Sequence, residues 1–289
     1  MPDSSTRVAR AGAFAAILVS LALLAGCSQE GSGGSSAAEL TARLPSGEGA
    51  VHYVDLVGLK VAFGVDLGAD PLAAGRDDFG YYALVGEPLP LLSRRFVPEL
   101  NEALALDDAT EVAATTGDDG GVSVIKTDGD LDEIAADLEA IGFELDGDAL
   151  IRAGAGETAA AVRLEDDLIF LAPSAEQLET IPAEPADPPQ PVIEGLTGLA
   201  ITVLGGDGDC VLSTSAVATA DGDGQLIFEI DSGASPNGPQ GDDPSGEITI
   251  GEPLVDDNLA IVPMSAGELQ SAPAQVVLEN EYLDYDCDA

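Results

Sequence analysis

The sequence predicts an α+β fold that is rich in strands and built from two related halves, the second with more β-structure. Hydrophobic residues make up 45% of the chain and the mean hydropathy is positive, which is typical of a globular protein. Residues 122–125 alternate and are β-branched, and residues 131–141 then repeat apolar positions every three or four residues. A strand followed by an amphipathic helix is therefore expected, and a similar unit recurs near the C-terminus.

Residues 1–26 have the layout of a secretory signal peptide. Two arginines precede an uncharged run from Ala11 to Leu24 that is rich in alanine and leucine. The run ends in Leu24-Ala25-Gly26-Cys27, which resembles a bacterial lipobox. The resemblance to bacterial lipoproteins implies that signal peptidase II cuts before Cys27 and that its thiol and new amino group are acylated. A plain membrane anchor is the alternative, although the uncharged run is at the lower limit for spanning a bilayer.

The lipidated Cys27 and the residues after it, 27–37, are expected to form a flexible tether. Their Gly/Ser-rich composition is typical of a flexible coil. Several acyl chains on one residue hold a protein to a membrane far better than a single chain. We therefore expect the protein on the extracytoplasmic face of the cell membrane, held there by its lipid anchor.

An α+β domain is predicted over residues 38–183. Asp130 precedes its best-defined helix as an N-cap and Gly142 ends it. An earlier helix over 91–106 must kink or break at Pro98. A short helix over 174–180 is expected to be capped by Ser174. The predicted strands are 50–57, 122–125, 143–145, 149–152, 160–164 and 168–171, with a turn at Asp146-Gly147 between the third and the fourth.

A proline-rich linker over residues 184–191 is predicted to separate this domain from a β-rich α+β domain over 192–289. The segment Asp221-Gly222-Asp223-Gly224 is typical of a hairpin turn between two of its strands. The strands predicted in the second domain are 199–204, 211–218, 225–230, 247–250 and 259–262.

The end of the first domain resembles a segment of the second. Residues 165–183 and 256–274 align without gaps, and their identities fall at a turn, a strand, a helix cap and a helix face. The identical pairs are Asp166/Asp257, Leu168/Leu259, Ser174/Ser265, Ala175/Ala266, Leu178/Leu269, Pro182/Pro273 and Ala183/Ala274. The pattern favours a duplicated strand-to-helix unit.

A second resemblance concerns the body of the protein. Leu104-Ala105-Leu106-Asp107-Asp108, then a strand and a helix ending in Ile141-Gly142-Phe143, resemble uncharacterised lipoproteins of high-GC Gram-positive bacteria. This resemblance implies a lipoprotein and no particular activity.

Acidic residues dominate the charge of the chain. The 53 acidic and 10 basic residues become 52 and 8 when Asp3, Arg7 and Arg10 are removed with the signal peptide. A body with so few bases cannot neutralise phosphates, so nucleic acid is excluded as a partner. The charge favours cations, a basic envelope protein, or simple solubility, and a lineage-wide acidic bias would produce the same composition.

The cysteine content fits an exported protein. With Cys27 lipidated, Cys210 and Cys287 are the two remaining thiols, and export makes a disulfide between them the simplest expectation. Such a bridge would contribute roughly 4 kcal/mol through chain entropy.

Catalytic motifs are scarce. His52 is the chain's one histidine, and its strand-like surroundings favour a structural role over that of a catalytic base. No Gly-x-Ser-x-Gly elbow and no P-loop is present, and one histidine with two paired thiols leaves too few ligands for zinc. Paired carboxylates for a hydrolase remain available among the many acids, although the chain has no tryptophan to stack on a sugar.

Calcium is the cation that the acidic loops fit best, because it prefers oxygen ligands. The acids of residues 128–139 follow EF-hand spacing, but Glu133 replaces the required glycine and a capped helix explains them better. The remaining candidates lie in turns, where turn chemistry is the first interpretation and metal binding the second. These candidates are Asp207, Asp209, Asp221 and Asp223.

We therefore expect a lipid-anchored envelope protein that acts as a non-catalytic binding or structural module, with no catalytic residues and no cofactor. A calcium-binding acidic surface module is the first alternative, and a carboxylate-dependent hydrolase is the second.

Overall fold

The structure is a computed structural model of the 289-residue chain. By its internal contacts the chain divides into residues 1–32 and 33–289, and every described residue belongs to the second unit. The described residues are 33–45, 49–63, 98–116, 121–152, 161–182, 184–185, 200–205, 211–218, 223–230, 235–236, 249–251, 254–256, 259–265 and 287–288.

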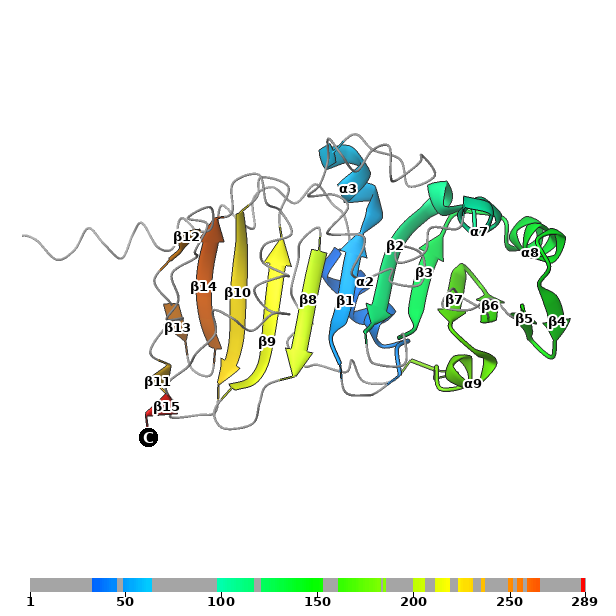
Figure 1. The fold of residues 1–289 in the computed structure, drawn as a ribbon. Helices are drawn as coiled ribbons and strands as arrows, with labels where there is room; N and C mark the ends of the chain where they lie inside the picture. Colours follow the sequence, from blue (N-terminus) through cyan, green and yellow to red (C-terminus); the bar gives the residue numbers. More distant parts are fainter. Residues whose placement is uncertain are drawn as a thin grey trace, which may run out of the picture. The chain divides into compact units, whose positions relative to one another are not determined.

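The first part of the described chain contains both helices and strands (Figure 1). Their order is α2 (Gly33–Thr41), β1 (Val51–Asp55), α3 (Leu56–Phe63), α7 (Pro98–Ala103), the 3-10 helix η1 (Leu106–Asp108), β2 (Ala109–Thr115), β3 (Ser123–Thr127), α8 (Leu131–Ala140), β4 (Glu144–Asp146), β5 (Ala149–Ile151), β6 (Ala161–Glu165), β7 (Leu168–Ala172) and α9 (Ala175–Leu178).

The elements described after residue 199 are all strands. They are β8 (Ala200–Gly205), β9 (Val211–Ala218), β10 (Asp223–Ile230), β11 (Ser235–Pro236), β12 (Thr249–Ile250), β13 (Leu254–Asp256), β14 (Leu259–Ser265) and β15 (Cys287–Asp288). The α+β fold class, strand-rich and with more β-structure in the second half, is confirmed.

One antiparallel sheet contains strands from both parts of the chain, and β11 and β15 form a separate two-stranded sheet. The order of the larger sheet is β12-β14-β10-β9-β8-β1-β2-β3-β7-β6-β5-β4, with β13 also paired to β14. β1 and β8 therefore meet in the middle of the sheet, although residues 38–183 and 192–289 were predicted as separate domains. That division stays a prediction, and most of the predicted linker lies outside the described residues.

The strand order is the same on both sides of the β1–β8 pair. We call β1, β2, β3 and β7 the N-terminal half-sheet, and β8, β9, β10 and β14 the C-terminal half-sheet. In each, three consecutive antiparallel strands are followed by an excursion and a fourth strand that returns beside the third. The matched leucines Leu168 and Leu259 begin the two returning strands, which agrees with the predicted duplication.

The register relates the two half-sheets by an approximate twofold axis. His52 lies opposite Ala114 on β2, and Thr202 lies opposite Ala216 on β9. Where β1 and β8 meet, the pairs are Val51 with Val203, His52 with Thr202, and Tyr53 with Ile201. A twofold rotation that swaps β1 with β8 maps the Val51–Val203 pair onto the Tyr53–Ile201 pair. The axis therefore passes through the His52–Thr202 pair.

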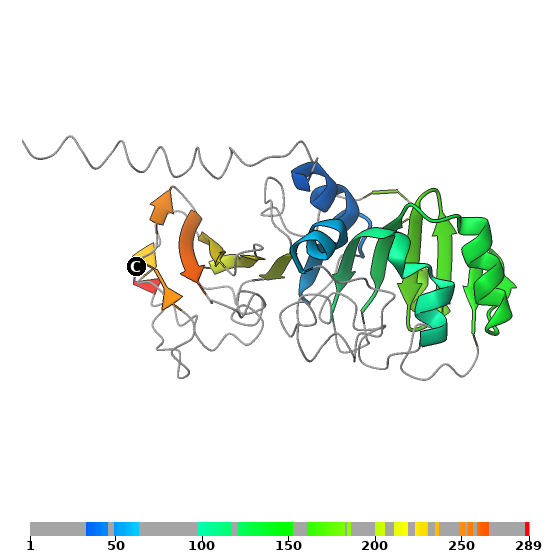
Figure 2. The same ribbon diagram turned by 90° about the horizontal axis from the view of Figure 1, so that it is seen from above.

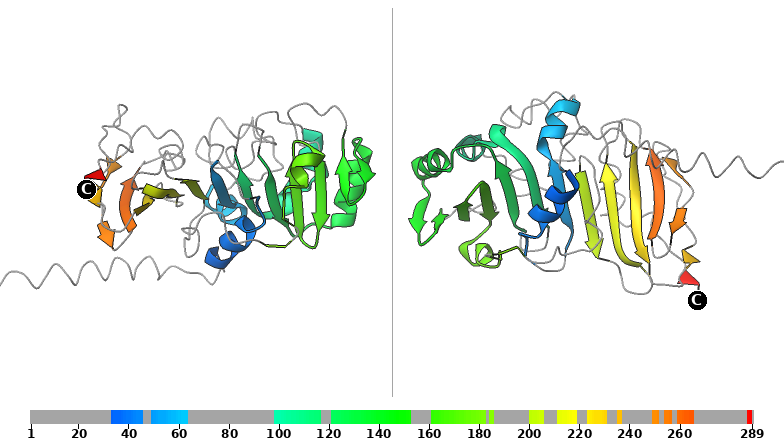
Figure 3. Two further views of the ribbon diagram at one scale, coloured as in Figure 1. Left: turned by 90° about the horizontal axis from the view of Figure 1, so that it is seen from below. Right: turned by 180° about the vertical axis from the view of Figure 1, so that it is seen from behind.

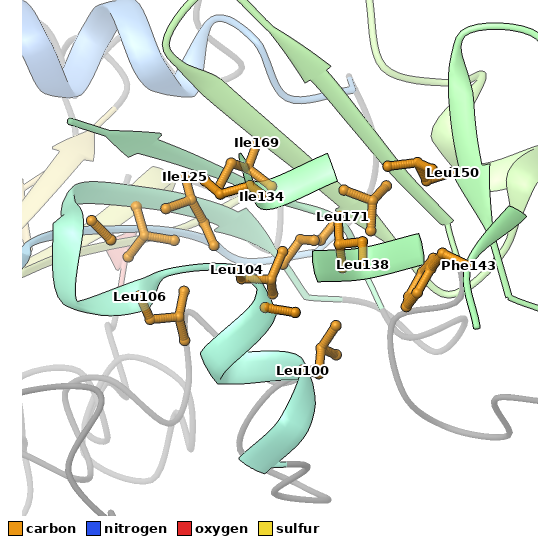
Figure 4. Close-up of a cluster of buried hydrophobic side chains, with 14 of the residues drawn as sticks. Leu100, Leu104, Leu106, Ile125, Ile134, Leu138, Phe143, Leu150, Ile169 and Leu171 are labelled. Carbon is orange, nitrogen blue, oxygen red and sulfur yellow. The ribbon is translucent and has the colours of Figure 1, made fainter. Parts of the chain in front are cut away.

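Helices flank the N-terminal half-sheet (Figure 2), and clusters of hydrophobic side chains cover both of its faces. On what we call the α8 face, α7 and α8 pack against alternate strand residues (Figure 4). The cluster drawn there includes Leu100, Leu104, Ile125, Ile134, Leu138, Ile169 and Leu171. On what we call the α2 face, α2 and α9 cover the intervening residues (Figure 3). That second cluster includes Ala37, Leu40, Tyr53, Val124, Phe170 and Leu178.

The predicted helix caps are confirmed. The Asp130 carboxylate accepts hydrogen bonds from the backbone N–H groups of Asp132 (2.9 Å) and Glu133 (3.4 Å) at the start of α8. Ser174 Oγ accepts one from the Gln177 N–H at the start of α9. Gly142 follows α8 with φ of 97°, the left-handed conformation that glycine adopts without strain. The EF-hand spacing therefore reflects a capped helix.

Three elements differ from the expectations. α2 begins at Gly33, so residues 33–37 of the predicted tether are helical, and burial of Ala37 and Leu40 outweighs their Gly/Ser-rich surroundings. The strand predicted over 50–57 stops at Asp55, whose carboxylate accepts a hydrogen bond from the Gly58 N–H (2.8 Å) as α3 begins. The helix predicted over 91–106 is described only as α7, which starts at Pro98 and is followed by Ala105 at φ 46°.

Candidate functional site

His52 occupies the middle of the sheet rather than an accessible site. It lies on the α8 face and is only 1% exposed, with Nε2 3.5 Å from the hydroxyl of Thr116. Burial disfavours the charged imidazolium and lowers the pKa of His52 to about 4. A buried, neutral histidine in a strand fits the structural role that the sequence predicted.

A surface hollow with a volume of about 190 Å³ lies on the α2 face. Its floor comes from β2, β3 and the start of β7, and its wall comes from α2. The side chains that line it are Glu39, Leu40, Arg43, Glu111, Lys126, Asp167 and Leu168. It therefore combines two cations, three carboxylates and two leucines.

Strand register sets the floor of the hollow. Lys126 on β3 lies directly opposite Glu111 on β2 and opposite Leu168 on β7. Facing residues on neighbouring strands project on the same side, so these three side chains lie in one row. Leu168 is buried, whereas Lys126 and Glu111 are half-buried and reach the hollow.

Helix α2 forms the wall because its apolar side packs on the sheet. Leu40 is buried there, and Thr41 Oγ1 donates a hydrogen bond to the Ala37 carbonyl (2.7 Å) within the helix. Glu39 is exposed and Arg43 is half-buried, so both charged groups project past the apolar contact to the rim of the hollow.

A second arginine lies beside the hollow on the same face. Glu165 lies between the two guanidinium groups, 3.8 Å from Arg43 Nη1 and 3.8 Å from Arg163 Nε. The Arg163 guanidinium lies over the Phe170 ring, 4.6 Å from its centroid. Arg163 Nε and Nη2 are buried and have no hydrogen-bond partner among the described residues, because Glu165 is beyond hydrogen-bond range of Nε.

The C-terminal half-sheet carries different residues at the equivalent positions. Leu259 on β14 pairs with Glu229 on β10 as Leu168 pairs with Lys126, so Glu229 stands where Lys126 would be. Glu229 is in turn opposite Ser213, the equivalent of Glu111. The positive charge on the floor of the hollow is therefore not required by the strand pattern that the halves share.

The sequence-predicted site residues lie elsewhere or outside the described residues. Cys27, Cys210, Asp207, Asp209 and Asp221 are not described, so lipidation and the Cys210–Cys287 disulfide stay predictions. Cys287 is in β15, which pairs with β11. Asp223 begins β10, opposite Ser265 of β14, so Asp223 and Gly224 of the predicted turn lie in a strand, and Asp221 and Gly222 lie outside the described residues.

Sequence reasoning missed Lys126 and Arg43 as site residues. One signal was present, because Lys60 and Lys126 are the two lysines of the whole chain. Within the described part of the chain, no three histidine, cysteine or carboxylate side chains gather as a metal site. No described helix combines the length and hydropathy needed to span a bilayer.

Comparisons with known proteins identify no family. No protein-family model matches the chain, and no curated protein matches it. Three crystal forms of TP0453 give a partial structural match. Form I has a TM-score of 0.46 at 9% identity, covering 84% of this chain and 98% of that one. Forms III and IV give TM-scores of 0.45 and 0.41 at 9% and 8% identity, each covering 83% of this chain and 98% of the other.

Proposed function

We propose that the protein is a lipid-anchored envelope protein whose body is a non-catalytic binding module, with the hollow on the α2 face as its ligand site. The gathering of several of the chain's few basic residues at the hollow carries this proposal. The whole chain has 10 basic residues against 53 acidic ones. Arg43 and Lys126 nevertheless line one hollow, and Arg163 lies beside it.

The difference between the half-sheets supports a functional origin for this charge. A lysine on the floor of the hollow has a glutamate as its counterpart in the other half. Stability alone gives little reason for the difference, because an exposed ion pair contributes only about 0–1 kcal/mol. Charged side chains that converge on a concave site are instead typical of ligand recognition.

The location of His52 supports the non-catalytic part of the proposal. The one histidine of the chain is buried on the α8 face, whereas the hollow opens on the α2 face. General base catalysis needs a group within hydrogen-bond reach of the substrate. His52 cannot reach a ligand held on the opposite side of the sheet.

Metabolic labelling with an alkyne fatty acid tests the anchor. The wild-type protein should take up the label in the membrane fraction, and Cys27→Ala should lose it. A labelled Cys27→Ala protein, or a wild-type protein that keeps its signal peptide and takes up no label, would contradict the lipid anchor.

A thermal-shift screen of the full-length protein tests the binding site. The library should contain amino acids, monocarboxylates, amines and sugars at millimolar concentration. Ligand at 100 times its Kd stabilises a folded protein by about 2.7 kcal/mol. We expect at least one compound to raise the Tm of the wild type and not that of Lys126→Met. A library that shifts neither protein, or shifts both equally, would contradict the proposed site.

A further inference from the structure

The hollow holds charges of both signs that have no counter-ion in the described structure. Within the described ranges, the ammonium of Lys126 makes no ion pair, and neither do the carboxylates of Glu39 and Asp167. Arg43 differs, because Glu165 lies within ion-pair distance of it. The lining therefore offers one unpaired cation and two unpaired anions to a ligand.

A ligand with a single charge does not match this lining. A simple anion would meet Lys126 but also the field of a chain with a net charge of −43. A simple cation would meet Glu39 and Asp167 but would be repelled by Lys126 and Arg43. A zwitterion satisfies both kinds of group and, with no net charge, is not repelled by the acidic body.

The size and the apolar part of the hollow limit the ligand further. Its volume of about 190 Å³ lies below the range of roughly 300–1,000 Å³ for sites that hold drug-sized ligands. Leu40 and Leu168 add apolar surface to the lining. A short aliphatic frame between two opposite charges fits this arrangement.

We infer that the hollow binds a small zwitterion of the amino-acid class, its carboxylate held by Lys126 and its ammonium by Glu39 and Asp167. This inference rests on the proposed binding function. It assigns the two sides of the hollow different tasks. The sheet floor binds the negative end of the ligand, while α2 and the turn before β7 bind the positive end.

Equilibrium dialysis of the full-length protein against the twenty free amino acids tests the inference. The tightest binder is then compared with its two single-charge analogues, one lacking the amino group and one lacking the carboxylate. For leucine these are 4-methylpentanoate and 3-methylbutylamine. We expect each analogue to bind at least tenfold more weakly than the amino acid, because each loses one charge-assisted contact.

Matched variants locate the site. Lys126→Met and Glu39→Gln should each weaken binding of the amino acid about tenfold or more, with unchanged circular dichroism and Tm. Glu229→Gln removes a charge at the equivalent of Lys126 and serves as the control, for which we expect wild-type affinity. Weakening by Glu229→Gln equal to that by Lys126→Met would show that the effect is not local to the hollow and would overturn the assignment.

The outcomes separate the inference from the proposed function. If a single-charge analogue binds as tightly as the amino acid, and Lys126→Met abolishes its binding, the zwitterion inference is wrong and the binding function stands. If no amino acid and no analogue binds, or if Lys126→Met leaves every affinity unchanged, the inference and the assignment of the hollow as a ligand site both fail.

Discussion

The two half-sheets share one strand order and differ in what has been added to it. In the N-terminal half-sheet, the excursion between β3 and β7 supplies α8 and three further strands that extend the sheet to β4. In the C-terminal half-sheet, the described residues between β10 and β14 form only short strands. The charged hollow is lined by the shared strands β2 and β3, the start of β7 with the turn before it, and α2, so the same strand pattern carries different side chains in its two copies.

The approximate twofold axis turns this contrast into an internal control. Where the strands of the two half-sheets overlap in register, a residue of one half has a counterpart at the same place in the other. Lys126 corresponds to Glu229, Phe170 to Ile261, and His52 to Thr202. A substitution in one half can therefore be judged against a matched substitution in the other.

The largest expected effect is in the core. Phe170 is fully buried and lies under the Arg163 guanidinium, whereas Ile261 is only partly buried. We expect Phe170→Ala to lower the free energy of unfolding by about 4 kcal/mol and Ile261→Ala by about 2 kcal/mol, since truncation costs most where the cavity cannot collapse. Urea denaturation of both variants measures the difference. Equal losses would show that the halves are equally well packed.

The pH dependence of stability tests the junction of β1 and β8, where His52 is buried. The pKa of His52 falls from 6.5 to about 4 on folding. As the pH drops below 6.5, the unfolded chain binds a proton that the folded chain does not, so stability is lost down to about pH 4. The loss amounts to about 3 kcal/mol.

Replacing His52 by threonine, the residue at the equivalent position Thr202, isolates the contribution of His52 to the pH dependence. The many carboxylates also titrate below pH 6, so the quantity to measure is the difference in unfolding free energy between wild type and His52→Thr at each pH. We expect that difference to shift by about 3 kcal/mol between pH 7 and pH 4, to the disadvantage of the wild type. A difference that stays constant with pH would contradict the burial of a neutral His52.

The elements that could be predicted from the sequence are those with local signals. α8 has an N-cap, a regular apolar spacing and a terminal glycine, and the structure places it at Leu131–Ala140. α3 escaped prediction because Leu56–Phe63 is almost continuously apolar and has no helical period, although Asp55 before it was a usable capping signal. α2 escaped because its stability comes from packing on the sheet rather than from its Gly/Ser-rich start.

The hollow could not be predicted in the same way. Its lining comes from α2, β2, β3 and the turn before β7, which are brought together by strand register and helix packing. Nothing local to Lys126 indicates that Glu39 lines the same hollow. The twofold arrangement was partly accessible, because the matched segments around Leu168 and Leu259 were visible as a repeat.

The cap of α8 tests an element that the C-terminal half-sheet lacks among its described residues. Asp130→Ala removes the acceptor for two backbone N–H groups, and we expect a loss of about 1 kcal/mol. Asp130→Ser keeps an N-cap acceptor and should lose only a few tenths of a kcal/mol. Chemical denaturation of both variants checks the order, and a loss shared equally by the serine variant would assign the effect to charge rather than to capping.

A small effect on stability is expected at Lys126, whose counterpart in the C-terminal half-sheet, Glu229, has the opposite charge. Lys126→Glu gives the N-terminal half-sheet the residue of its counterpart. Lys126 makes no ion pair within the described residues, but a glutamate at this position would face Glu111 across the strands, so we expect the unfolding free energy to fall by less than about 1 kcal/mol. Binding of the amino acid should nevertheless disappear, because the carboxylate of the ligand would face another carboxylate. A variant that unfolds much more easily would instead show that Lys126 stabilises the sheet, and the contrast with Glu229 would then be structural.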